Sequence, residues 1–131
     1  MMRLLMLVVT SLFLCSPVTA HAEQVVREFT GSRSMETSEF EVKSPWLIDW
    51  LVNSDFPNDM GISISLLNVG TESYAGRIVK TKRPDNGLRL MNEGGRFRFK
   101  VDAAVSNWRI KVIQLTEEEA ELYAPRNTLD F

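Results

Sequence analysis

The stretch Ser44–Asn53, Ser-Pro-Trp-Leu-Ile-Asp-Trp-Leu-Val-Asn, decides how the sequence folds, and it holds two of the three tryptophans. Trp46, Ile48, Trp50 and Val52 recur at every second position, a spacing that puts all four side chains on one face of a β-strand. A strand with this much aromatic surface on one face needs other elements to cover it. The stretch therefore predicts an inner strand of an all-β domain.

A helix is the alternative for the same stretch. Ser44 is a suitable N-cap and Pro45 is allowed at the first helical position. Trp46, Leu47, Trp50 and Leu51 would then share a helix face. We favour the strand because the neighbouring segments all have β patterns, and because Trp, Ile and Val suit pleated surfaces.

Most of the remaining chain consists of short alternating segments separated by Gly, Asn and Pro turns. Lys82–Gly87 is expected to be such a turn, since it contains Pro and Asn-Gly. The pattern predicts an antiparallel β-sandwich of about 7–8 short strands. Besides the tryptophan strand, we expect strands at Gln24–Thr30, Thr37–Lys43, Ile62–Leu66, Tyr74–Thr81, Leu88–Met91, Arg96–Asp102 and Asn107–Gln114.

The end of the chain is expected to be helical. Thr116 followed by Glu119 is a capping-box pattern, which predicts a short acidic helix over about 116–124 that ends at Pro125, with a frayed tail after it. Leu47 and Leu51 point outward from the tryptophan strand and are expected to pack under this helix. The alternative is that these two leucines form a contact surface for a partner or a second copy.

The N-terminus has the pattern of a secretory signal. Arg3 supplies the positive charge, Leu4–Leu14 is an almost unbroken apolar run, and Ala20-His21-Ala22 is a small-x-small cleavage pattern. We predict a cleaved signal peptide at 1–22 and a single domain at 23–131, located in the periplasm or secreted. No later segment reaches the length of about 20 apolar residues that a membrane span needs.

Cleavage removes the only cysteine and the only histidine, Cys15 and His21. Thiol nucleophiles, Ser-His-Asp hydrolysis and the usual zinc or copper sites are then excluded. We expect no enzymatic activity, no cofactor and no metal. Calcium binding by Asp55, Asn58 and Asp59 is an alternative, although their spacing matches no EF-hand loop.

Several stretches resemble a widespread group of small secreted bacterial all-β domains of uncharacterised function. The resemblance covers most of Phe29–Val112 and implies an exported, compact β-sandwich, without assigning any catalytic or binding residue. The matching stretches are Phe-Thr-Gly-Ser at 29–32, Thr-Ser-Glu-Phe-Glu-Val at 37–42, Pro-Trp-Leu-Ile-Asp-Trp at 45–50, Gly-Gly-Arg-Phe-Arg-Phe-Lys-Val at 94–101 and Asn-Trp-Arg-Ile-Lys-Val at 107–112.

The inward-facing positions of these strands predict the core. We expect it to contain Phe40, Trp46, Ile48, Trp50, Phe97, Phe99, Trp108 and Ile110. Each tryptophan shares its strand face with Ile or Val, which is typical of an inward face. The alternative is that the tryptophans form an exposed platform for stacking sugars.

The outward positions of the last two expected strands are basic. If these strands pair as a hairpin, Arg96, Arg98, Lys100, Arg109 and Lys111 crowd one sheet face, which could bind an anionic partner. Arg77, Lys80, Lys82, Arg83 and Arg89 are expected to extend it. The alternative is a solvated face, neutralised by Glu39, Glu41 and Asp49 as cross-strand partners or by the acidic helix.

These features favour an exported, non-catalytic binding module that contacts a protein or another envelope component through a sheet face. A carbohydrate- or anionic-glycan-binding module is the first alternative, and a periplasmic inhibitor of a cell-wall hydrolase is the second. Nucleic acid is not an expected partner, because the chain has 17 acidic against 15 basic residues.

Overall fold

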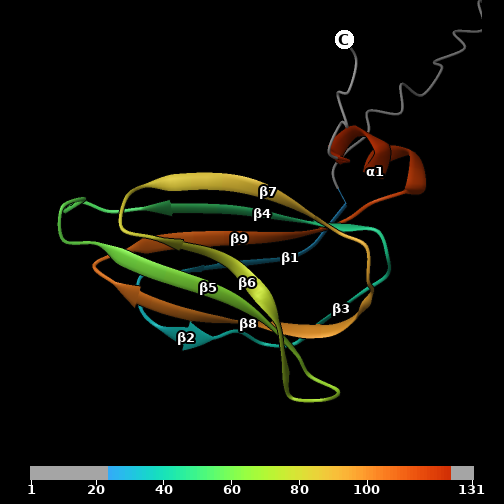
Figure 1. Ribbon diagram of the computed structural model, residues 1–131, viewed down its shortest axis with the longest axis horizontal. Coiled ribbons are helices and arrows are strands. Elements are labelled where there is room, and N and C mark those ends of the chain that lie inside the picture. The colour runs from blue at the N-terminus through green and yellow to red at the C-terminus, as the bar shows by residue number, and fades with distance from the viewer. Residues whose placement is uncertain (1–23, 125–131) are drawn as a thin grey trace, which may run out of the picture.

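A computed structural model describes residues 24–124. Over this range the chain forms nine β-strands in two antiparallel sheets, which pack face to face, and one short helix near the C-terminus (Figure 1). The predicted all-β sandwich is confirmed. The predicted signal peptide at 1–22 and the predicted frayed tail after Pro125 lie outside the described residues.

The first sheet, called sheet A below, joins the beginning of the described chain to its end. Its strand order is β1-β9-β4-β7. The central positions belong to β9 and to the tryptophan strand β4, so the stretch Ser44–Asn53 is a strand and not a helix. The bounds are β1 Gln24–Gly31, β4 Trp46–Asn53, β7 Asp85–Met91 and β9 Asn107–Gln114.

The second sheet, sheet B, has the order β2-β8-β5-β6, with β3 also paired to β8. Thr37 lies between β2 and β3, where its amide donates to the Phe99 carbonyl and its Oγ1 accepts from the Phe99 amide, both at 2.9 Å. The predicted strand Thr37–Lys43 is confirmed only for Phe40–Val42, because at its start the Thr37 side chain takes the place of a backbone partner. The bounds are β2 Met35–Glu36, β3 Phe40–Val42, β5 Gly61–Asn68, β6 Ser73–Thr81 and β8 Gly95–Ala104.

One buried cluster fills the space between the sheets. Trp46, Trp108 and Trp50 are 0%, 3% and 9% exposed. The indole N–H of Trp46 donates to the Glu93 carbonyl at 2.7 Å, and that of Trp108 donates to the Arg33 carbonyl at 3.1 Å, so neither is left without a partner. All eight residues predicted for the core lie in this cluster: Phe40, Trp46, Ile48, Trp50, Phe97, Phe99, Trp108 and Ile110.

Two tryptophans lie over glycines on the edge strands of sheet A. Trp50 is paired with Gly87 on β7, and Trp108 is paired with Gly31 on β1. A Cβ built on Gly87 would approach Trp50 Cζ2 to 2.6 Å, and one on Gly31 would approach Trp108 Cζ2 to 2.5 Å. The predicted turn Lys82–Gly87 is wrong in its second half, because Asn86 and Gly87 belong to β7. The missing side chain of Gly87 leaves space for the Trp50 indole.

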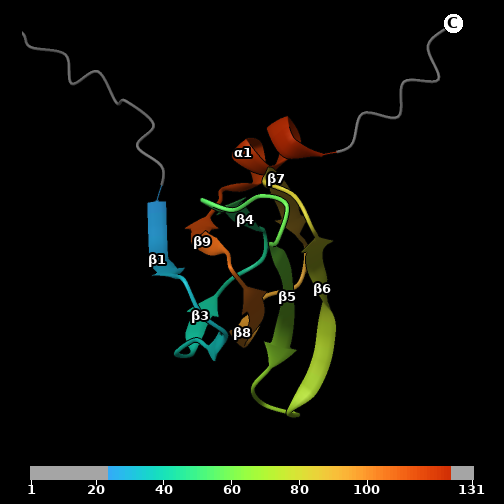
Figure 2. The ribbon, with the colours of Figure 1, turned by 90° about the vertical axis from the view of Figure 1, so that its left-hand side faces the viewer.

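Six links join the two sheets: β3–β4 and β7–β8 lie at the end that carries the helix, and the other four gather at the opposite end (Figure 1). These four are the links β1–β2, β4–β5, β6–β7 and β8–β9. Figure 2 views the molecule from this end, with the strands of the two sheets as separate layers. The opposite end carries the helix, so the two ends of the sandwich differ in chemistry.

The helix α1, Glu117–Tyr123, begins at a complete capping box formed by Thr116 and Glu119, as expected from the sequence. It lies on the outer face of sheet A, meaning the face turned away from the core. There Leu47, Ile113, Leu115 and Ala120 form a second buried cluster, with Leu90 packed against it. Within residues 24–124, no helix is long and apolar enough to cross a membrane.

Candidate functional site

The structure does not bring the five predicted basic residues together. Strand β8 pairs with β5, β2 and β3 in sheet B, whereas β9 pairs with β1 and β4 in sheet A. The link Val105-Ser106 carries the chain from one sheet to the other instead of closing a hairpin. The prediction of one shared basic face is therefore wrong. Arg96, Arg98 and Lys100 lie on the outer face of sheet B, and Arg109 and Lys111 lie on the outer face of sheet A.

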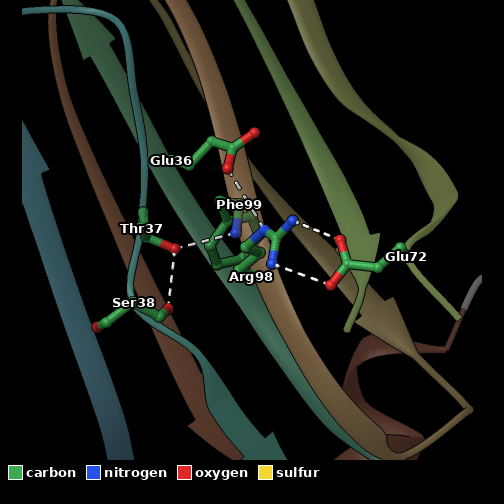
Figure 3. A network of polar contacts seen from close by, with 6 residues as sticks. All are labelled: Glu36, Thr37, Ser38, Glu72, Arg98 and Phe99. Carbon is green, nitrogen blue, oxygen red and sulfur yellow. Dashed lines mark hydrogen bonds and ion pairs between the residues drawn. The ribbon is translucent and has the colours of Figure 1, made fainter. Parts of the chain in front are cut away.

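Arg98 is held by two glutamates (Figure 3). Its Nη2 donates to Oε2 of Glu72 at 2.7 Å, and its Nε lies 3.6 Å from Oε2 of Glu36. The hydrogen bond to Glu72 is the largest cause that raises the pKa of Arg98. Desolvation lowers this pKa, whereas the negative charges of Glu72, Glu36 and Glu39 raise it further. Because its pKa is raised, the Arg98 guanidinium stays charged through the physiological pH range.

The other two basic residues of β8 also face carboxylates. Arg96 is paired in register with Glu41 on β3, and Lys100 with Glu36 on β2. On the same outer face, Arg77 and Lys80 of β6 stand opposite Ser65 and Ser63 of β5. The centre of this face is therefore largely neutralised, as the solvated-face interpretation expects.

Replacing Arg98 by glutamate should lower the melting temperature of the domain, because a third carboxylate would stand beside Glu36 and Glu72. Arg98→Gln, which removes one charge and adds none, should lower it by less. Thermal unfolding followed by circular dichroism measures both. Arg77→Glu, opposite a serine on the same face, is the matched control and should change the melting temperature least. Equal losses for the Glu and Gln variants would contradict the expected repulsion between the new carboxylate and the two glutamates.

The two basic residues of β9 differ from each other in their neighbours. Lys111 stands between Asp49 on β4 and Glu28 on β1. Arg109 stands between Leu51 and Thr30, with no acid opposite it on either side. Its Nε is shielded from solvent and has no hydrogen-bond partner within the described chain. Arg109 is thus the member of the predicted set with no acid directly opposite it, and the nearest acids of the two strands, Asp49 and Glu28, stand opposite Lys111 and diagonal to Arg109.

A shallow hollow of about 260 Å³ lies beside Arg109. The side chains of Leu51 and Leu88 are 36% and 57% exposed there, although both are large and apolar. Helix α1 covers Leu47 and not Leu51, so the prediction that both leucines pack under the helix is wrong for Leu51. The hollow is lined by Asp49, Trp50, Leu51, Asn86, Gly87, Leu88 and Arg109.

A second hollow, of about 350 Å³, opens at the opposite edge of the sandwich, where β1 passes β3. Its charged residues are of both signs, and it has fewer exposed apolar groups. It is lined by Val26, Arg27, Glu39, Phe40, Glu41 and Arg96. The hollow beside Arg109 is the better candidate site, because it joins an arginine that has no acid directly opposite it to two exposed leucines.

The lining of the Arg109 hollow offers one guanidinium, one carboxylate, one amide and two leucines. This set can bind a side chain that is partly apolar and partly acidic, since a guanidinium forms two parallel hydrogen bonds to a carboxylate. Across residues 24–124, no group of three or more His, Cys, Asp or Glu side chains is gathered to hold a metal. Asp55, Asn58 and Asp59 are all exposed in the β4–β5 loop.

No protein-family model matches the chain, and a search of curated proteins finds no match either. Sequence reasoning named Arg109, Leu51 and Asp49 but missed Asn86 and Leu88, which form the other wall of the hollow. The alternation of Asn86, Leu88 and Leu90 was a signal for a longer β7, and the Asn-Gly pair obscured it.

Proposed function

We propose that the protein is an exported, non-catalytic binding module that holds a protein partner of the cell envelope against the outer face of sheet A. The anchor is the hollow lined by Asp49, Leu51, Asn86, Leu88 and Arg109. The observation that carries the proposal is Arg109 itself. Its Nε is buried and has no hydrogen-bond partner in the described structure, and leucine and threonine rather than acids stand beside it.

The chemistry of the hollow defines the partner. Arginine is enriched at the centres of protein interfaces, where a carboxylate from the partner completes its hydrogen bonds. Leu51 and Leu88 offer apolar surface on either side of that charge. The proposed partner therefore presents an acidic side chain within an apolar patch, and the neutralised outer face of sheet B has no part in the contact.

The burial of the tryptophans weighs against the glycan alternative. Trp46, Trp108 and Trp50 all belong to the core cluster, so they offer no stacking platform to a saccharide. The inhibitor alternative is a special case of the proposal, in which the partner is a cell-wall hydrolase.

The test is capture of envelope proteins at low salt on the protein as cells export it, followed by a titration with each purified candidate. Arg109→Glu should raise the dissociation constant of the partner at least about tenfold, which corresponds to about 1.4 kcal/mol. Leu88→Ser should weaken the complex in the same direction.

Arg96→Glu is the matched control, because it makes the same charge change on the outer face of sheet B. It should leave the dissociation constant unchanged. Equal losses for Arg96→Glu and Arg109→Glu would contradict the proposal, as would a partner whose affinity Arg109→Glu does not alter. Binding to envelope polysaccharide with no protein partner would replace the proposal by the glycan-binding alternative.

A further inference from the structure

The free edges of the two sheets are not alike. Strand β1 has a register shift between Val25 and Arg27, and β6 has two shifts against β5. The edge formed by β2 and β3 is interrupted at Thr37, whose side chain bonds to β8. Strand β7 instead pairs with β4 over seven consecutive residues without a shift. It is therefore the most regular of these edges.

The free side of β7 is suited to adding another strand. Within residues 24–124 the strand pairs only with β4, so no described strand bonds to the backbone groups on its other side. No proline interrupts it, since Pro84 precedes its first residue. Leu88, at its centre, is 57% exposed. A regular edge with an exposed leucine at its centre favours pairing with a second strand.

The charges at the two ends of β7 are opposite. Lys82 and Arg83 directly precede the strand, in the β6–β7 link. Helix α1 contacts β7 near its other end, where Leu90 packs against the cluster that includes Ala120 (Figure 1). The helix is acidic and has no basic residue in its last turn. Its acidic residues are Glu117, Glu118, Glu119 and Glu121.

This polarity selects the strand that fits the edge. We propose that β7 pairs antiparallel with β7 of a second copy of this chain, about a two-fold axis at Leu88. Each acidic helix then lies beside the Lys82-Arg83 link of the other copy, whereas a parallel arrangement would bring like charges together. The two copies of sheet A become one continuous sheet.

The residue pairs across the proposed seam are compatible. On the outer face, Leu88 meets its own equivalent and covers its exposed surface. On the inner face, Arg89 stands opposite Gly87 of the second copy, which has no side chain, and diagonal both to Asp85, of opposite charge, and to Arg89, of like charge. Its Nη1 is held by the Arg77 carbonyl of β6. The proposal does not rest on the proposed function, because it depends on the edge of β7 and not on Arg109. The two share Leu88, so the charge variants of the link and of the helix, which leave Leu88 in place, are the ones that distinguish them.

Sedimentation velocity over a concentration series at low salt tests the proposal, with the exported protein. The wild type should form a dimer. The pair Lys82→Glu, Arg83→Glu should raise the dimer dissociation constant at least about tenfold, because it sets acid against acid at both ends of the seam. The pair Glu118→Lys, Glu121→Lys should also weaken the dimer, because it leaves the helix with two acidic and two basic residues and no net charge to attract the basic link.

An equimolar mixture of these two double variants is the decisive sample. In the antiparallel mixed dimer, one helix–link contact is that of the wild type and the other sets the two new lysines beside the two new glutamates, so the mixture should dimerise more tightly than either variant alone. Leu88→Lys should weaken the wild-type dimer independently, by placing two like charges on the axis. The control is Arg27→Glu, Arg33→Glu, which makes the same net change beside the opposite edge of sheet A and should dimerise like the wild type.

Three results would overturn the proposal. One is a wild type that remains monomeric up to about 0.5 mM, since even weak specific association is detectable there. Another is a pair of folded double variants that dimerise as the wild type does. The last is a mixture that stays monomeric while circular dichroism shows both variants folded.

Discussion

Replacing Trp46 by alanine is expected to lower the free energy of unfolding by about 3–5 kcal/mol, a large share of the 5–15 kcal/mol typical of a small domain. The side chain is 0% exposed, and its ring lies 5.7 Å from that of Phe40 and 5.4 Å from that of Phe97. Alanine would leave a cavity at the centre of the core and the Glu93 carbonyl without its indole donor. Urea unfolding followed by circular dichroism gives the value.

Two control variants show how large this loss is in comparison with milder substitutions. Trp46→Phe keeps most of the apolar volume and should cost less than the alanine variant. Leu122→Ala, at a side chain that is 78% exposed, should change the free energy of unfolding by no more than about 0.5 kcal/mol. A loss below about 1 kcal/mol for Trp46→Ala would contradict the central position of this tryptophan.

Replacing Gly87 by alanine is expected to cost about 1–3 kcal/mol, although it adds a single methyl group to an edge strand. The new Cβ would lie 2.6 Å from Cζ2 of Trp50, so the indole must leave its packed position. The same urea measurement gives the loss. Gly61→Ala is the matched control, because nothing lies within 4 Å of a Cβ at that strand glycine.

A double-mutant cycle tests the cause of this loss. If the indole is the obstacle, Gly87→Ala should cost far less in a Trp50→Leu background than in the wild type. An equal cost in both backgrounds would mean that Gly87 is needed for its backbone alone. Gly31 faces Trp108 in the same way, so Gly31→Ala should resemble Gly87→Ala.

Alternation predicted the strands well but did not predict which strands pair. Phe97 and Phe99 of β8 and Trp108 and Ile110 of β9 alternate in the same way whether their strands are neighbours in one sheet or face each other across the core. The link of two residues between them looked like a hairpin turn, and the structure uses it to change sheets. Period two reports which face is buried and not which sheet a strand joins.

The same ambiguity explains why the sequence alone could not identify the candidate site. The sequence named all five basic residues of β8 and β9, and it named Glu41 and Asp49 among their possible partners. Which cation lacks an acid depends on register, and register joins residues far apart in the chain, as in the pair Arg109 and Leu51. Only the strand order shows which acids stand beside the other four, and that Arg109 has none directly opposite it.

The position of β9 in sheet A has a consequence for how the chain is made. It is the final strand of the described residues, yet it lies between β1 and β4, and it pairs Gln24 with Gln114. Strand pairing across such distances is slow, because the loop entropy is lost before the contacts form. During synthesis, β1 has no strand to pair with in sheet A until β9 is made. Until then β4 can pair only with β7. In sheet A, the strand that the others need first is the one that the ribosome makes last.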